Sequence, residues 1–80
     1  MSYKEMLDRL LAVFNEVFKG QNIDENTTTA TIENWDSLKQ IELMIACEEE
    51  FDVHFSMQQI ISAASVKEIL QILLEKKGNQ

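Results

Sequence analysis

Three consecutive residues, Asp36, Ser37 and Leu38, place a hydroxyl group beside a carboxylate at the start of a helical pattern. A hydroxyl at an exposed helix N-terminus is accessible to a modifying enzyme, and the helix dipole with its free N–H groups favours a phosphate attached there. A serine at a helix start also has a simpler role, because it commonly caps the unpaired N–H groups of the first turn. The residue types alone leave both roles open for Ser37.

The rest of the sequence offers little other chemistry. It contains one histidine, His54, and one cysteine, Cys47, and it lacks Gly-x-Ser-x-Gly, His-Glu-x-x-His and Cys-x-x-Cys motifs. A hydrolase triad and a zinc site therefore have too few members. Cys47 falls on the apolar side of its expected helix, where a buried thiol is inert. We assign no role to His54, and we expect no metal and no catalysis by the chain itself.

Apolar residues recur at helical spacing in four stretches, which predicts an all-α fold, a four-helix bundle with one short member. The first helix is expected over roughly 3–19, because Gly20 follows where a left-handed residue would end it. Residues 20–36 show no sustained period and are rich in Asn, Thr, Asp and Glu, which predicts a long loop held by Ile23, Ile32 and Trp35. The other helices are expected from Ser37, over 57–62, and from Val66 to Lys77 with Gly78 beyond the end.

Each expected helix begins at a serine with Glu or Gln three residues later, the spacing of a capping box. The four serines are Ser2, Ser37, Ser56 and Ser65. Capping alone therefore gives Ser37 no distinction from the other three.

The helix that begins at Ser37 carries more apolar surface than one core needs. Its core stripe comprises Leu43, Met44, Cys47 and Phe51, and a neighbouring stripe comprises Leu38, Ile41 and Ile45. The second stripe is available to contact partner enzymes or to line a crevice.

The net charge is −7, and it is concentrated in the middle of the chain, over 20–56. This charge repels phosphate backbones and excludes nucleic-acid binding, whereas partners with basic patches fit it. Eighty residues without a repeat predict one domain, 1–80. The absence of a disulfide pair, a secretory signal and a long apolar run predicts a cytoplasmic protein without membrane insertion, and we expect a monomer.

The middle of the chain resembles the acyl and peptidyl carrier protein family. The resemblance rests on Asp36-Ser37-Leu38, on the step Ile41-Glu42-Leu43, and on the close Glu48-Glu49-Glu50-Phe51-Asp52. It continues through the short third helix and the Ser65-Val66 opening of the fourth, so it covers essentially the whole chain.

The resemblance implies that Ser37 carries 4′-phosphopantetheine, which a separate Mg²⁺-dependent phosphopantetheinyl transferase installs from coenzyme A. Acyl groups would then be held as thioesters on this arm for acyl-loading and acyl-transfer enzymes. The resemblance also implies recognition roles for the neighbours of Ser37 and for residues along the same helix. These residues are Asp36, Leu38, Ile41, Glu42, Ile45, Glu48 and Glu49. For Asp36, the simpler alternative is a role as the N-cap of the helix.

Three features depart from the family pattern: Lys39 where an acidic residue is common, Trp35 in place of a small residue, and an uncharged third helix. They favour a specialised pathway, such as polyketide, nonribosomal peptide, lipid or cell-envelope acylation. An aminoacyl or D-alanyl carrier stays open within the carrier class. Outside the carrier class, the alternative is an unmodified acidic adaptor that binds basic partner surfaces through the helix that begins at Ser37.

Overall fold

The first helix, α1, spans Tyr3–Val17 and begins where Ser2 accepts a hydrogen bond from the backbone N–H of Glu5. The structure is a computed structural model that describes residues 2–77. The helix ends at Val17 and not near residue 19, because the backbone of Phe18 leaves the helical conformation while its ring enters the core. Gly20 follows with φ of +84°, a left-handed conformation that costs glycine little.

The second helix, α2, spans Ser37–Phe51 and ends at Asp52, which is left-handed with φ of +53°. The N–H of Asp52 donates to the carbonyl of Glu48, and this bond closes the last turn. The start at residue 37 was predicted from the sequence, and of the two possible caps that it offered, Ser37 and Asp36, the structure selects Asp36, as described below.

The remaining helices are α3, Met57–Ser62, and α4, Val66–Lys77, with the boundaries that the sequence predicted. At α3, Ser56 and Gln59 form the full reciprocal capping box. At α4, Ser65 accepts a hydrogen bond from the N–H of Glu68 at 3.1 Å. The predicted role of Gly78 at the end of α4 lies outside the described residues.

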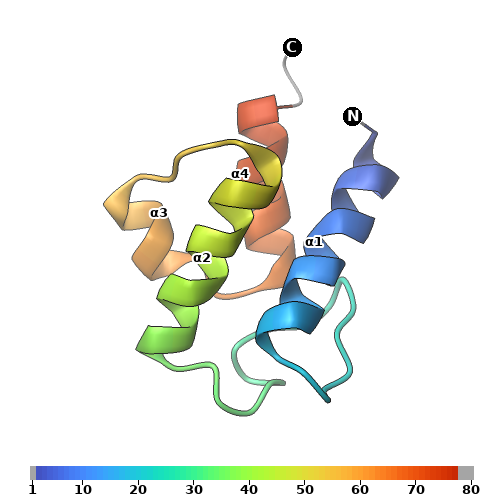
Figure 1. Cartoon of the computed structure of the whole chain (residues 1–80), viewed down its shortest axis with the longest axis vertical. Coiled ribbons are helices and arrows are strands. Elements are labelled where there is room, and N and C mark those ends of the chain that lie inside the picture. Colours follow the sequence, from blue (N-terminus) through green and yellow to red (C-terminus); the bar gives the residue numbers. More distant parts are fainter. Residues whose placement is uncertain (1, 78–80) are drawn as a thin grey trace.

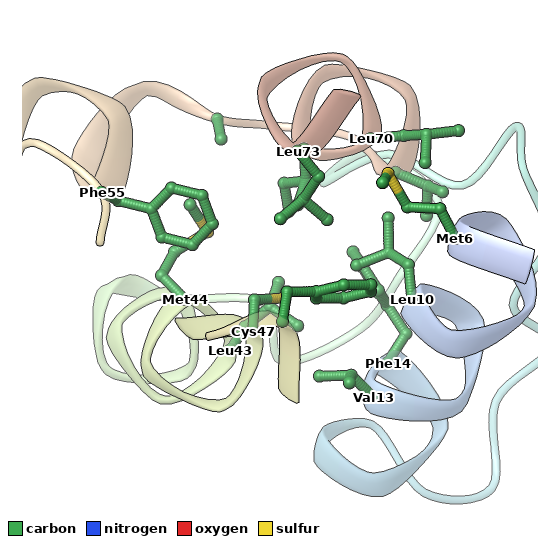
Figure 2. Close-up of a cluster of buried hydrophobic side chains, with 14 of the residues drawn as sticks. Met6, Leu10, Val13, Phe14, Leu43, Met44, Cys47, Phe55, Leu70 and Leu73 are labelled. Atoms are coloured by element: carbon green, nitrogen blue, oxygen red, sulfur yellow. The ribbon is translucent and has the colours of Figure 1, made fainter. Parts of the chain in front are cut away.

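The core is built by apolar side chains from α1, α2 and α4 that converge on one interior (Figure 2). Its largest fully buried members include Phe14, Phe51, Met6, Leu10, Leu43, Met44, Ile69 and Leu73. The predicted core stripe of α2 is confirmed, because Leu43, Met44, Cys47 and Phe51 are all buried. α1 packs against α2 and α4, while the short α3 contacts α2 (Figure 1).

The segment between α1 and α2 is tied to the segment before α4. Thr28 forms an isolated antiparallel bridge with Ser65, and the N–H of Val66 donates to the carbonyl of Thr27 at 3.0 Å. As expected, Ile32 is buried, and Ile23 and Trp35 pack partly against the core. These contacts hold the segment against the core and against the residues before α4, up to the start of α2.

Residues 2–77 form four helices and no named strand. The radius of gyration is 11.5 Å, close to the value of about 11.6 Å expected for a compact chain of this length. In the described part of the chain, no helix combines the length and apolar character needed to cross a membrane.

Candidate functional site

The N-cap of α2 is Asp36, not Ser37. Its carboxylate oxygen Oδ1 accepts a hydrogen bond from the backbone N–H of Lys39 at 2.9 Å, and its carbonyl accepts from the N–H of Gln40. The capping box predicted for Ser37 and Gln40 is therefore wrong. An aspartate directly before a serine competes with it for the N-cap position, and here Asp36 has the extended backbone conformation typical of a cap.

Ser37 is consequently the first residue of α2 and has no capping role. It is exposed to solvent, and within residues 2–77 its hydroxyl has no hydrogen-bond partner. The other serines predicted to cap, Ser2, Ser56 and Ser65, all accept a hydrogen bond from a backbone N–H. The structure thus separates Ser37 from these serines, which the sequence alone did not.

A groove of about 350 Å³ opens beside Ser37, between the first turn of α2 and the C-terminal end of α3. Its apolar lining comes from Trp35, Ile41, Ile60, Ile61 and Ala63. The residues that complete it are Thr29, Asp36, Ser37, Gln40, Ser62 and Ala64. A group attached to the Ser37 oxygen would therefore begin at the edge of a mainly apolar groove.

One wall of this groove is held by Gln40. Its side-chain Nε2 donates to the carbonyls of Ile60 and Ala63, each at 2.7 Å, and its Oε1 accepts from the indole Nε1 of Trp35. The indole also contacts two rings of α1, with centroids 5.5 Å from Phe14 and 5.3 Å from Phe18. From the sequence, Gln40 had only the role of partner in a capping box, because its acceptors lie 20 and 23 residues away in the chain.

The surplus apolar stripe of α2 faces solvent, as predicted. Leu38, Ile41 and Ile45 are 67%, 47% and 49% exposed. The uncharged helix α3 adds Met57 and Ile61, which are also exposed, and Ile61 shares the groove with Ile41. These five residues, here called the apolar patch, lie on the two helices that flank the groove.

The acidic residues assigned to partner recognition differ in their surroundings. Glu49 is exposed, and Glu42 is exposed and pairs with Lys39 at 3.3 Å. Glu48 is half-buried, and its Oε2 accepts a hydrogen bond from the backbone N–H of Phe55 at 2.8 Å. Glu48 therefore helps to fix the chain between α2 and α3, and Glu42 and Glu49 are the carboxylates available on the surface.

Cys47 is buried in the core of α2. Burial raises the pKa of its thiol from 9.0 to about 12, and the nearby carboxylates of Glu50 and Glu48 add to this shift. A thiol held protonated is neither a nucleophile nor a metal ligand. His54 lies exposed between α2 and α3, and residues 2–77 contain no group of three or more His, Cys, Asp or Glu side chains arranged to hold a metal ion.

Comparison with protein-family models and with curated proteins yields no match for this chain. The site combines an exposed serine hydroxyl that has no partner among residues 2–77, an adjacent carboxylate that caps the helix, and an apolar groove.

Proposed function

We propose that this chain is a carrier protein that holds acyl groups on a 4′-phosphopantetheine arm attached to Ser37. The observation that carries the proposal is the Ser37 hydroxyl, which is exposed, has no hydrogen-bond partner among residues 2–77, and opens α2 beside the groove. Because Asp36 performs the capping, the hydroxyl is available to react without loss of a helix cap.

The residues around Ser37 fit the proposed group. The first N–H groups of a helix lack partners within it and favour a phosphate there, and only that of Lys39 is taken by the Asp36 carboxylate. The groove lining of Trp35, Ile41 and Ile61 suits a flexible, partly apolar arm. The negative charge of Asp36 opposes the phosphate, so its proposed benefit lies in recognition by the transferase.

The modification step is a phosphoryl transfer. The Ser37 oxygen attacks the β-phosphorus of coenzyme A, the diphosphate bond breaks, and 3′,5′-adenosine diphosphate leaves. The hydroxyl proton passes to a base of the separate Mg²⁺-dependent transferase. The attached arm supplies a terminal thiol that forms thioesters, and every later reaction is carried out by partner enzymes, so the chain itself is no enzyme.

Partner enzymes are proposed to dock on α2 and the adjoining α3. The apolar patch provides contact area, and Glu42 and Glu49 provide charges that attract Lys and Arg patches and accelerate encounter. Leu38 follows Ser37 directly and is 67% exposed, so a transferase that reaches Ser37 also meets Leu38. Ile45 would extend the contact one turn beyond Ile41.

We further propose that the four helices form a bundle with a long loop between α1 and α2. In this proposal the protein is a cytoplasmic monomer that serves a specialised biosynthetic pathway. The uncharged α3 and the presence of Trp35 beside Ser37 are the features that favour such a pathway over general fatty-acid synthesis.

A second candidate is an acidic adaptor that binds a basic partner through the same face without modification. The exposed apolar patch beside Glu42 and Glu49 favours it, because such a surface would serve an adaptor equally well. The two candidates differ in their need for the Ser37 oxygen.

The test is the intact mass of the protein after incubation with coenzyme A, Mg²⁺ and a broad-specificity phosphopantetheinyl transferase. We expect one phosphopantetheinyl addition in the wild type and in the control Ser62→Ala, whose serine is also exposed and lines the same groove. We expect none in Ser37→Ala. If several transferases leave the folded, initially unmodified wild type unchanged, the adaptor becomes the better explanation.

A further inference from the structure

The helix α3 lies against α2 without contributing a buried side chain of its own. None of its own side chains, over Met57–Ser62, is buried. Its flanking residues Phe55 and Ala63 enter the core, and Ile60 packs only partly against it. Additional interactions at its ends therefore have a large influence on its position.

Gln40 supplies such an interaction at the C-terminal end of α3. Its amide group donates to the carbonyls of Ile60 and Ala63 and accepts from Trp35, so both donor protons and the acceptor are used. The three bonds fix the orientation of the amide, because exchanging its oxygen and nitrogen would oppose carbonyl to carbonyl. The side chain thus joins α2, α3 and the segment before α2.

Trp35 extends this connection to α1. Its indole contacts Phe14 and Phe18, which are 0% and 3% exposed, while its Nε1–H reaches Gln40. We call Trp35 and Gln40 the latch. Both residues line the groove beside Ser37, so the latch is part of the groove wall.

We propose that the latch closes the inner side of the groove, so that cargo carried on Ser37 lies in the open groove and does not enter the core. This inference rests on the proposed carrier function. For a chain to pass between α2 and α3, the two bonds from Gln40 must break and leave the carbonyls of Ile60 and Ala63 without partners. Such unpaired polar groups are unfavourable away from water, and more so beside an apolar chain.

Closure of the inner side of the groove limits the class of cargo that the carrier would suit. Cargo that stays at the surface remains accessible to water and to partner enzymes, and its length contributes little to the stability of the carrier. Trp35 and Gln40 are positioning residues in this scheme, because they shape the groove and contact no reacting atom. The carrier would thus suit short or polar acyl groups better than long alkyl chains.

The test compares acyl forms of the wild type with those of three variants. The transferase is supplied with acetyl-, hexanoyl- or decanoyl-coenzyme A, loading is verified by intact mass, and Tm is measured. In the wild type we expect Tm to be independent of acyl length. In Gln40→Ala we expect a lower Tm for the unloaded protein and a Tm that rises from acetyl to decanoyl, as the chain enters the opened interface.

Two further variants isolate the hydrogen bonds. Gln40→Glu keeps an acceptor for Trp35 but removes the donors to α3, so we expect it to behave like Gln40→Ala. The control Gln58→Ala makes the same chemical change at an exposed α3 residue, and we expect its Tm to be independent of acyl length, as in the wild type. A wild-type Tm that rises from acetyl to decanoyl cargo would overturn this inference while leaving the carrier proposal intact.

The latch itself is tested on the unmodified protein by amide hydrogen exchange. Loss of two hydrogen bonds in Gln40→Ala should speed exchange in α3 by about tenfold or more, while α4 is little affected. Unchanged exchange in α3 would show that Gln40 does not hold the helix, and would overturn the proposal. If no mass is added to Ser37, the carrier function is wrong, and the inference about cargo falls with it. The mass measurement therefore separates a failure of the carrier function from a failure of the latch.

Discussion

The Asp36 carboxylate accepts a hydrogen bond from the backbone N–H of Lys39, and this bond assigns the capping of α2 to the residue before Ser37. A carrier serine that also capped its helix would lose that contact when modified. With the two roles on separate residues, attachment of a group at Ser37 leaves the helix start intact. Replacement of these two adjacent residues should therefore affect stability to different extents.

We expect Asp36→Ala to lower the free energy of unfolding by about 1 kcal/mol, because it removes the N-cap. Ser37→Ala should change it by less than roughly 0.5 kcal/mol, since the hydroxyl is exposed and makes no hydrogen bond within residues 2–77. Urea titration measures both values. Asp36→Asn is the control, because asparagine caps well without the charge. A larger loss for Ser37→Ala than for Asp36→Ala would contradict this assignment.

Glu48 is expected to affect stability, because its carboxylate accepts from the backbone N–H of Phe55. Glu48→Ala leaves that part-buried N–H without this acceptor and should cost about 1–3 kcal/mol in urea unfolding. Glu48→Gln retains an acceptor oxygen in a side chain of the same shape and should lose much less. Equal losses for the two variants would indicate that charge, and not this hydrogen bond, is what matters at Glu48.

The sequence predicted the helices and both stripes of α2 because these depend on local periodicity. Leu43 and Cys47 are buried while Leu38 and Ile45 are exposed, as the helical spacing required. The sequence left the N-cap open between Asp36 and Ser37, since both are good capping residues and the spacing to Gln40 matches a capping box at the serine. The backbone conformation decided between them.

The latch and the Glu48 contact were beyond the reach of sequence patterns. Gln40 bonds to carbonyls of α3, and any residue type supplies a carbonyl, so no residue type marks the acceptors. Glu48 likewise pairs with a backbone N–H. Its position within Glu48-Glu49-Glu50 suggested one shared surface role, whereas the three-dimensional structure distinguishes the half-buried Glu48 from the exposed Glu49.

Cys47 predicts a loss of stability in alkaline solution. The thiol of the unfolded chain ionises near pH 9.0, whereas burial keeps the folded thiol protonated until about 12. Its contribution is therefore fully present below pH 9 and declines as the pH rises from 9 toward 12, at up to about 1.4 kcal/mol per pH unit.

Urea unfolding at pH values on either side of 9 measures this decline. Cys47→Ala is the matched control, because it removes the thiol and leaves every other ionisable group in place. We expect its stability to be lower at neutral pH, from lost packing, but to fall less steeply above pH 9. Parallel pH profiles for the two proteins would contradict the role of Cys47. A thiol reagent should also react with the native protein far more slowly than with the unfolded chain.

The exposed carboxylates of α2 should control the rate of encounter with a basic transferase. We expect Glu42→Gln combined with Glu49→Gln to lower kcat/KM for phosphopantetheinyl transfer by several-fold to about tenfold at low ionic strength. The difference should shrink as salt is added, because exposed charges are screened. Lys39 already offsets part of the Glu42 charge through their 3.3 Å pair, so Glu49→Gln alone should have the larger single effect.

The control is Glu5→Gln combined with Glu25→Gln, which makes the same change in net charge away from α2. Both residues are exposed. If this control slows the reaction as much as the α2 pair does, the overall charge of −7 governs the encounter and α2 has no special role in it.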